Sequence, residues 1–96
     1  MAKLTPEARR FRRWLTDTFD VQGCDALLDQ LVGDFNELVL LRERARLARE
    51  AGDDTLYLKY TAAITKMTAS FVRTWKCAGL AGVELPAEIR SATNRR

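Results

Sequence analysis

The residues with the clearest chemical role in this sequence are basic side chains gathered near its start. Between Lys3 and Arg13 there are five basic residues and one acid, Glu7. The basic residues are Lys3, Arg9, Arg10, Arg12 and Arg13. Ammonium and guanidinium groups bind phosphate oxygens, so this cluster predicts contacts with the backbone of a nucleic acid. Such contacts tolerate changes of base sequence and weaken steeply as the salt concentration rises.

The charge of the whole chain fits this interpretation and leaves an alternative open. The formal net charge is +3, the middle of the chain is nearly balanced, and Arg90, Arg95 and Arg96 form a second basic group. An uneven distribution of this kind favours a polyanionic partner. A solvated basic helix face that binds no partner would contain the same residues.

Residue types needed for catalysis are scarce. The chain has no histidine, which removes the commonest general base, and Cys24 and Cys77 therefore have no histidine to activate them. The glycines form no phosphate-binding loop, and helix capping explains the carboxylate pair Asp53-Asp54. We expect no enzymatic activity, no small-molecule substrate and no cofactor. Without histidine or a CxxC motif, we also expect no metal site.

The composition is that of a globular protein within the cell. Hydrophobic residues make up 47% of the 96 residues and charged residues 30%, too apolar for disorder and too interrupted by charge for a membrane span. The early arginines interrupt any apolar run of the signal-peptide kind, so we expect no export. Antiparallel helices could bring Cys24 near Cys77, but in a cell we expect both to stay reduced.

The basic residues need a helix to position them, and the sequence predicts one from Pro6 to about Phe19. Thr5 is suited to cap its first turn, proline is favourable at the first helical position, and Glu7 complements the helix dipole. An apolar stripe lies opposite the arginines and contains Ala8, Phe11, Trp14 and Leu15. Phe11 and Trp14 are expected to anchor the helix in the core. Stacking of Trp14 on nucleic-acid bases is the alternative role.

Two longer segments follow, about Asp25 to Arg49 and Thr55 to Leu80. Their apolar residues recur at alternating spacings of three and four, which is the period of a helix with one buried face. Gly52 can end the first helix and Asp53 or Asp54 can cap the second. Because the connection is short, we expect an antiparallel hairpin.

The predicted fold is therefore all-α, a single domain over residues 1–96. It consists of a basic helix at 6–19, a helical hairpin at 25–80 and a C-terminal tail at 81–96, in which Pro86 begins a short helix to about Ala92. The helices of the hairpin carry apolar residues on more sides than one partner helix can cover. Either the first helix covers the remaining sides or another copy of the chain does. We expect self-association, through Leu38, Val39, Leu40, Leu41, Leu58, Ala62, Ala69 and Val72.

These features together resemble one group of small terminase subunits of tailed phages and prophages. The motif residues are Leu4-Thr5-Pro6-Glu7-Ala8-Arg9-Arg10-Phe11 with Trp14, Leu27-Leu28, Ala51-Gly52, Leu58-Lys59 and Cys77-Ala78-Gly79-Leu80. The likeness extends over about Leu4 to Leu80. The hairpin loop and the C-terminal tail are shorter here than in many such proteins.

The resemblance implies a non-catalytic DNA-packaging subunit in the cytoplasm of a bacterial host. Such a subunit assembles into a homo-oligomeric ring, engages double-stranded viral DNA and regulates the large terminase subunit, which is the ATPase and nuclease. Two other functions stay open. A helical adaptor would dock a protein partner through the same apolar surface without binding nucleic acid, and a dimeric regulator would bind one palindromic site.

Overall fold

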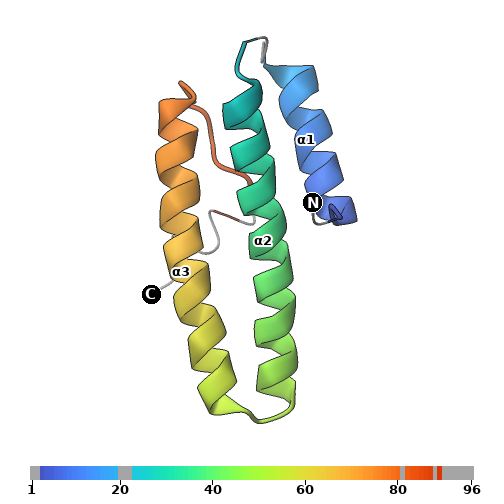
Figure 1. Cartoon of the computed structure of the whole chain (residues 1–96), viewed down its shortest axis with the longest axis vertical. Helices are drawn as coiled ribbons and strands as arrows, with labels where there is room; N and C mark the ends of the chain where they lie inside the picture. Colours follow the sequence, from blue (N-terminus) through green and yellow to red (C-terminus); the bar gives the residue numbers. More distant parts are fainter. Residues whose placement is uncertain (1–2, 20–22, 81, 88, 90–96) are drawn as a thin grey trace.

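The computed structural model describes residues 3–19, 23–80, 82–87 and 89, and these contain three helices and no strand. Helix α1 spans Pro6–Thr18, α2 spans Asp25–Glu50 and α3 spans Asp54–Cys77. Figure 1 shows α2 and α3 as an antiparallel hairpin, with α1 beside the first half of α2. The all-helical class and the helical hairpin predicted from the sequence are confirmed.

The first helix begins as its sequence predicts. The Thr5 side-chain oxygen accepts a hydrogen bond from the Ala8 N–H at 3.1 Å, and Pro6 occupies the first helical position. A second bond ties this turn to α2, because the Thr5 N–H donates to Oδ1 of the buried Asn36 at 2.8 Å. Thr5 therefore both caps α1 and fixes its start against the hairpin.

The hairpin turn is built from local capping bonds. Gly52 adopts a φ of +74°, the left-handed conformation that ends α2. Two residues later α3 begins, and the Asp53 carboxylate accepts from the Leu56 N–H at 3.0 Å. The chain thus reverses within a few residues, as the sequence predicts.

The end of α3 differs from the prediction. The helix ends at Cys77, three residues before the predicted end at Leu80. Gly79 takes a φ of +81°, and the Leu80 N–H donates to the Trp75 carbonyl at 3.2 Å. This bond closes a helix-ending turn that keeps Leu80 half-buried. An apolar residue that follows the helical period can thus lie beyond the helix.

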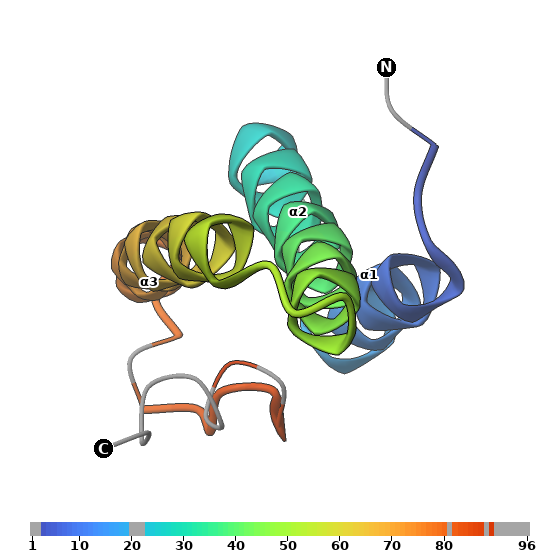
Figure 2. The same cartoon turned by 90° about the horizontal axis from the view of Figure 1, so that it is seen from below.

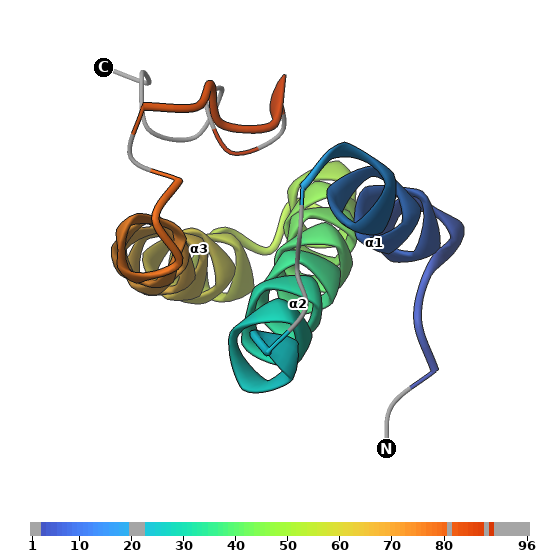
Figure 3. The ribbon, with the colours of Figure 1, turned by 90° about the horizontal axis from the view of Figure 1, so that it is seen from above.

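The core lies in the half of the molecule that α1 covers. In Figures 2 and 3 the segment after α3 lies off one face of the hairpin, so that the core is bounded by all three helices and by this segment. The fully buried members include Leu15, Phe71, Trp75 and Ile89, each at most 2% exposed. Burial of these large apolar side chains is the main term that holds α1 and the segment after α3 in place.

Among the described residues of the segment after α3, a side-chain hydrogen bond and the buried Ile89 tie it to the core, and Val83 and Leu85 also pack on the core. The Trp75 indole N–H donates to the Val83 carbonyl at 3.3 Å, and Ile89 is 1% exposed. The Ile89 N–H donates to the Pro86 carbonyl at 2.9 Å, which forms a helical turn at the predicted start. The rest of the helix predicted to about Ala92 lies outside the described residues.

Candidate nucleic-acid and assembly surfaces

Helix α1 separates its apolar and basic residues cleanly. Ala8, Phe11 and Leu15 are buried against the hairpin. All five residues predicted to contact DNA are exposed: Lys3, Arg9, Arg10, Arg12 and Arg13. An amphipathic helix whose apolar stripe is held in the core must present its other side to solvent, so the arginines form one exposed basic face. We call these five residues the α1 basic face.

Two of these arginines have partners within the chain. Arg9 Nη1 donates to the Leu4 carbonyl at 3.0 Å, a neutral acceptor that leaves the positive charge uncompensated. Arg12 Nη1 lies 3.7 Å from Asp29 Oδ1, a long and exposed ion pair. Exposed pairs of this kind contribute about 0–1 kcal/mol, so a phosphate group could displace Asp29 at little cost.

Trp14 differs from the prediction that it is a core anchor. It packs against the core aromatics, with its ring centroid 6.1 Å from that of Phe11 and 6.3 Å from that of Trp75. It nevertheless stays 40% exposed, whereas Phe11 is 6% exposed and fits the prediction. Trp14 therefore presents apolar aromatic surface at the edge of the α1 basic face, and packing and ligand stacking do not exclude each other at this position.

A cavity of about 430 Å³ opens beside Trp14. Helices α1 and α2 contribute its aromatic residues, and the segment after α3 contributes Leu85, Pro86 and Ala87. Its charged lining residues are Glu7, Arg10 and Glu84. The sequence gives no direct signal for this cavity, because its lining residues come from segments that are far apart along the chain.

The eight residues predicted at an assembly interface divide into three groups. Leu38 and Leu41 are buried in the single chain, with exposures of 3% and 9%, so they do not lie on its surface. Val39 and Val72 are partly buried and pack on the core, and Leu40 is half-buried. The exposed members are Leu58, Ala62 and Ala69.

The physical reason for this division is that only one side of α2 faces α3 at this level. Leu38 and Leu41 share a stripe with the buried Ala45 and Ala48, at alternating spacings of three and four, and this stripe packs on α3. Helix α1 packs beside the first half of α2, and its start is tied to Asn36, just before this run. The surplus apolar surface that the sequence predicts is therefore smaller than expected, and it is shifted toward the hairpin tip.

Two exposed leucines outside the predicted interface belong to this tip region. Leu47 is 52% exposed and Leu56 is 38% exposed, beside Leu58 at 66%. Leu47 lies seven residues after Leu40, so the two share one side of α2. This spacing can be read from the sequence, and it indicates an apolar edge of α2 that continues beyond the part covered by α1.

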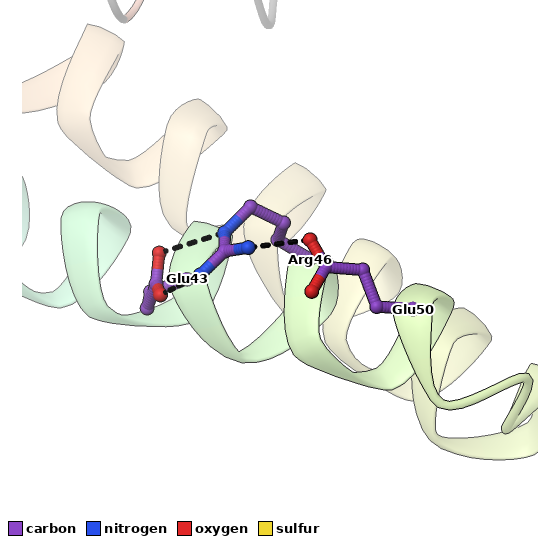
Figure 4. Close-up of polar contacts among 3 residues, drawn as sticks. All are labelled: Glu43, Arg46 and Glu50. Carbon is purple, nitrogen blue, oxygen red and sulfur yellow. Dashed lines mark hydrogen bonds and ion pairs between the residues drawn. The ribbon is translucent and has the colours of Figure 1, made fainter.

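A second group of arginines lies on α2 near the tip, where a groove of about 710 Å³ runs between α2 and α3. Figure 4 shows Arg46 between Glu43 and Glu50, with hydrogen bonds to both carboxylates. The bond from Arg46 lowers the pKa of the Glu43 carboxyl, and both acids raise the pKa of the guanidinium. Arg46 is thus already paired with two carboxylates, and this stretch has less free positive charge for a phosphate than α1 has.

Clusters of metal-binding side chains and membrane-spanning helices are both absent from the part of the chain that the structure describes. No group of three or more His, Cys, Asp or Glu gathers there as a metal site. No helix in those residues has the length and apolar character needed to cross a bilayer. Cys24 and Cys77 are exposed free thiols. Comparisons of the chain with family models, with curated proteins and with solved structures find no match.

Proposed function

We propose that this chain is a non-catalytic DNA-packaging subunit of the small terminase kind. In this role it assembles into a ring, engages double-stranded viral DNA and regulates a large terminase subunit that is the ATPase and nuclease. The observation that carries the proposal is the α1 basic face, which is exposed because the opposite side of the same helix is buried in the core. The motif resemblance to small terminase subunits supports the packaging role.

The α1 basic face suits phosphate contact better than the reading of bases. Its four arginines lie along one short helix, and a rigid helix holds them at fixed spacings on one side. Each guanidinium that contacts a phosphate releases bound counterions from the DNA, so affinity should fall with the logarithm of the salt concentration. We expect weak dependence on base sequence in duplex DNA.

Two exposed apolar edges support assembly into a ring. Leu58, Ala62 and Ala69 recur at spacings of four and seven along α3, so they share one side of that helix. Leu40 and Leu47 share one side of α2. These are different surfaces of the hairpin, and contact between two different surfaces of identical chains gives a ring when the rotation closes.

A paired substitution tests the DNA contact. The double variant Arg9→Gln/Arg13→Gln should bind duplex DNA more weakly, and its slope of log affinity against log salt should be smaller by about 1.8, because each lost phosphate contact removes about 0.9. Arg44→Gln/Arg73→Gln is the matched control, since it removes the same charge at exposed positions outside α1. Equal losses in the two double variants would show that α1 is not the contact.

Native mass spectrometry tests the assembly. The unmodified chain should give one closed oligomer at micromolar concentration, and Leu58→Lys should shift it to monomer. Lys59→Glu alters the charge of the next residue along α3 and should leave the oligomer intact. A strict monomer for the unmodified chain would refute the ring.

The exposed leucines at the hairpin tip favour a second candidate, a helical adaptor for a protein partner. Leu47, Leu56 and Leu58 offer apolar surface of the kind found at protein interfaces. The two functions differ in one measurement. A packaging subunit retards duplex DNA with a steep salt dependence, whereas an adaptor does not bind it.

A further inference from the structure

The indole ring of Trp14 is held in a fixed orientation although much of it is exposed. Its plane lies within 3° of the plane of Trp75, and the ring of Phe19 meets it edge-on at 89° with centroids 5.5 Å apart. With 40% of the residue still exposed, the ring offers a rigid aromatic surface. A planar group can stack on such a surface without the cost of ordering a mobile side chain.

The cavity beside this ring has the size and the walls of a site for a planar group. Its volume of about 430 Å³ lies within the usual range of ligand pockets. Phe11, Trp14 and Phe35 line it from α1 and α2, and Leu85 and Pro86 line it from the segment after α3. Aromatic and proline surfaces are well suited to contact the two faces of a flat ring.

The polar residues of the cavity match the edge of a purine. Arg10 supplies N–H donors, Glu7 supplies carboxylate acceptors one helical turn away, and Glu84 is a second carboxylate in the lining. Adenine and guanine both present N7 as an acceptor for Arg10; beside N7, adenine has an amino donor and guanine has O6, a second acceptor. A pyrimidine has no N7, and its smaller ring stacks over less of an indole. This combination of donor, acceptor and aromatic wall favours a purine over a pyrimidine.

The cavity adjoins the α1 basic face, so a DNA strand held there could place a base in it. Arg13 precedes Trp14 in the chain, and Arg10 lies one turn before it. A base within a duplex is stacked on both faces and cannot enter, whereas an unpaired base can. We infer that the cavity beside Trp14 binds an unpaired purine base of the DNA whose phosphates contact α1, an inference that rests on the proposed function.

Duplexes that differ in one bulged nucleotide test this inference. The full chain is titrated against labelled duplexes whose bulge is a purine, a pyrimidine or an abasic site, and fluorescence anisotropy gives the affinity. Purine bulges should bind at least about fivefold more tightly than the abasic duplex, the lower end of what stacking on an aromatic side chain contributes. Pyrimidine bulges should bind more weakly than purine bulges, because a pyrimidine lacks N7 and stacks over less of the indole.

Matched variants separate the cavity from the phosphate contacts. Arg9→Met and Arg10→Met each remove one positive charge and its N–H donors from α1, but only Arg10 lines the cavity. Both should weaken binding to every duplex, and only Arg10→Met should abolish the preference for a purine bulge. Trp14→Leu should abolish it too while keeping an apolar side chain, with circular dichroism as the check on folding.

The outcomes distinguish this inference from the proposed function. If all duplexes bind with a steep salt dependence and the bulged base makes no difference, the cavity is not a base site and the DNA-binding function stands. If Arg9→Met loses the preference as fully as Arg10→Met, the cavity is likewise excluded. If no duplex binds at low salt, the proposed function and this inference both fail.

Discussion

The indole rings of Trp14 and Trp75 lie parallel, with 3° between their planes and 6.3 Å between their centroids. They join the first helix to the end of the third, although α1 packs chiefly on α2. Their environments differ, because Trp75 is 2% exposed and donates its indole N–H to the Val83 carbonyl, whereas Trp14 is 40% exposed. Trp75 is therefore part of the buried core, whereas Trp14 borders the candidate site.

The two tryptophans should therefore contribute unequally to stability. Trp75→Ala removes a fully buried ring and should lower the free energy of unfolding by about 3–5 kcal/mol. Trp14→Ala removes a ring that is already partly in water, so its cost should be clearly smaller. Urea denaturation at one protein concentration measures both. Equal losses would mean that Trp14 is as deeply packed in solution as Trp75.

Capping of α1 gives a second prediction. Thr5→Ala removes the oxygen that accepts from the Ala8 N–H and should lower the free energy of unfolding by about 1 kcal/mol. Asn36→Ala leaves the Thr5 N–H without its acceptor in a partly buried place, at a cost of about 1–3 kcal/mol.

Thr16→Ala is the control for these variants. Its hydroxyl donates only to carbonyls of its own helix at an exposed position, so the substitution should be nearly neutral. The measurement is again urea denaturation. Alanine has the higher helix propensity, so a loss at Thr16 as large as that at Thr5 would show that the loss at Thr5 is not specific to the cap.

The helix starts show what local sequence can predict. Thr5, and Asp53 or Asp54, were expected as caps, and the structure has Thr5 and Asp53 in this role, because a cap depends on residues within one turn. The end of α3 was placed wrongly at Leu80, since apolar spacing continues through the turn that Gly79 forms. A periodic pattern reports which residues are buried, and a residue can be buried on either side of a helix end.

The candidate site could be predicted only in part, for a related reason. Exposure of Arg9 and Arg13 follows from the amphipathic pattern of one helix. The partial exposure of Trp14 depends on where Trp75 and the segment after α3 lie, and no pattern within α1 contains that information. The shape of the cavity depends on tertiary packing, whereas the exposure of the α1 basic face follows from the helical period of α1 alone.

Asp34 gives a prediction for pH dependence. It is 9% exposed on α2, burial raises the pKa of its carboxyl above the ordinary value of 3.8, and a hydrogen bond from Gln30 opposes part of that rise. Where the folded state binds more protons than the unfolded state, stability falls as pH rises. The charged carboxylate therefore lowers the free energy of unfolding at neutral pH. Protonation of Asp34 removes this cost as the pH falls toward the ordinary pKa value.

Asp34→Asn tests this sign. The amide keeps an acceptor for Gln30 and carries no charge, so the variant should be more stable than the unmodified chain at neutral pH. The difference should shrink as the pH falls toward 3.8 and be lost below it, where Asp34 is protonated in both states. Asp17→Asn changes an exposed carboxylate and is the control. A stability difference that stays constant from neutral to acidic pH would contradict the assignment.

Two glycines on α2 and at its end should respond in opposite ways to the same substitution. Gly33 lies within the helix, and a Cβ added there meets no atom within 4 Å. Because alanine loses less backbone freedom on folding, Gly33→Ala should raise the free energy of unfolding by about 1 kcal/mol.

Gly52 also has open space, but its φ is +74°, which a residue with a Cβ adopts only with strain. Gly52→Ala should therefore lower the free energy of unfolding by about 1–2 kcal/mol. Thermal and urea denaturation of the two variants at equal concentration measure both shifts. Since neither site offers a steric contact to a new methyl group, opposite signs can come only from the backbone conformation, and equal signs would show that the turn at Gly52 differs in solution.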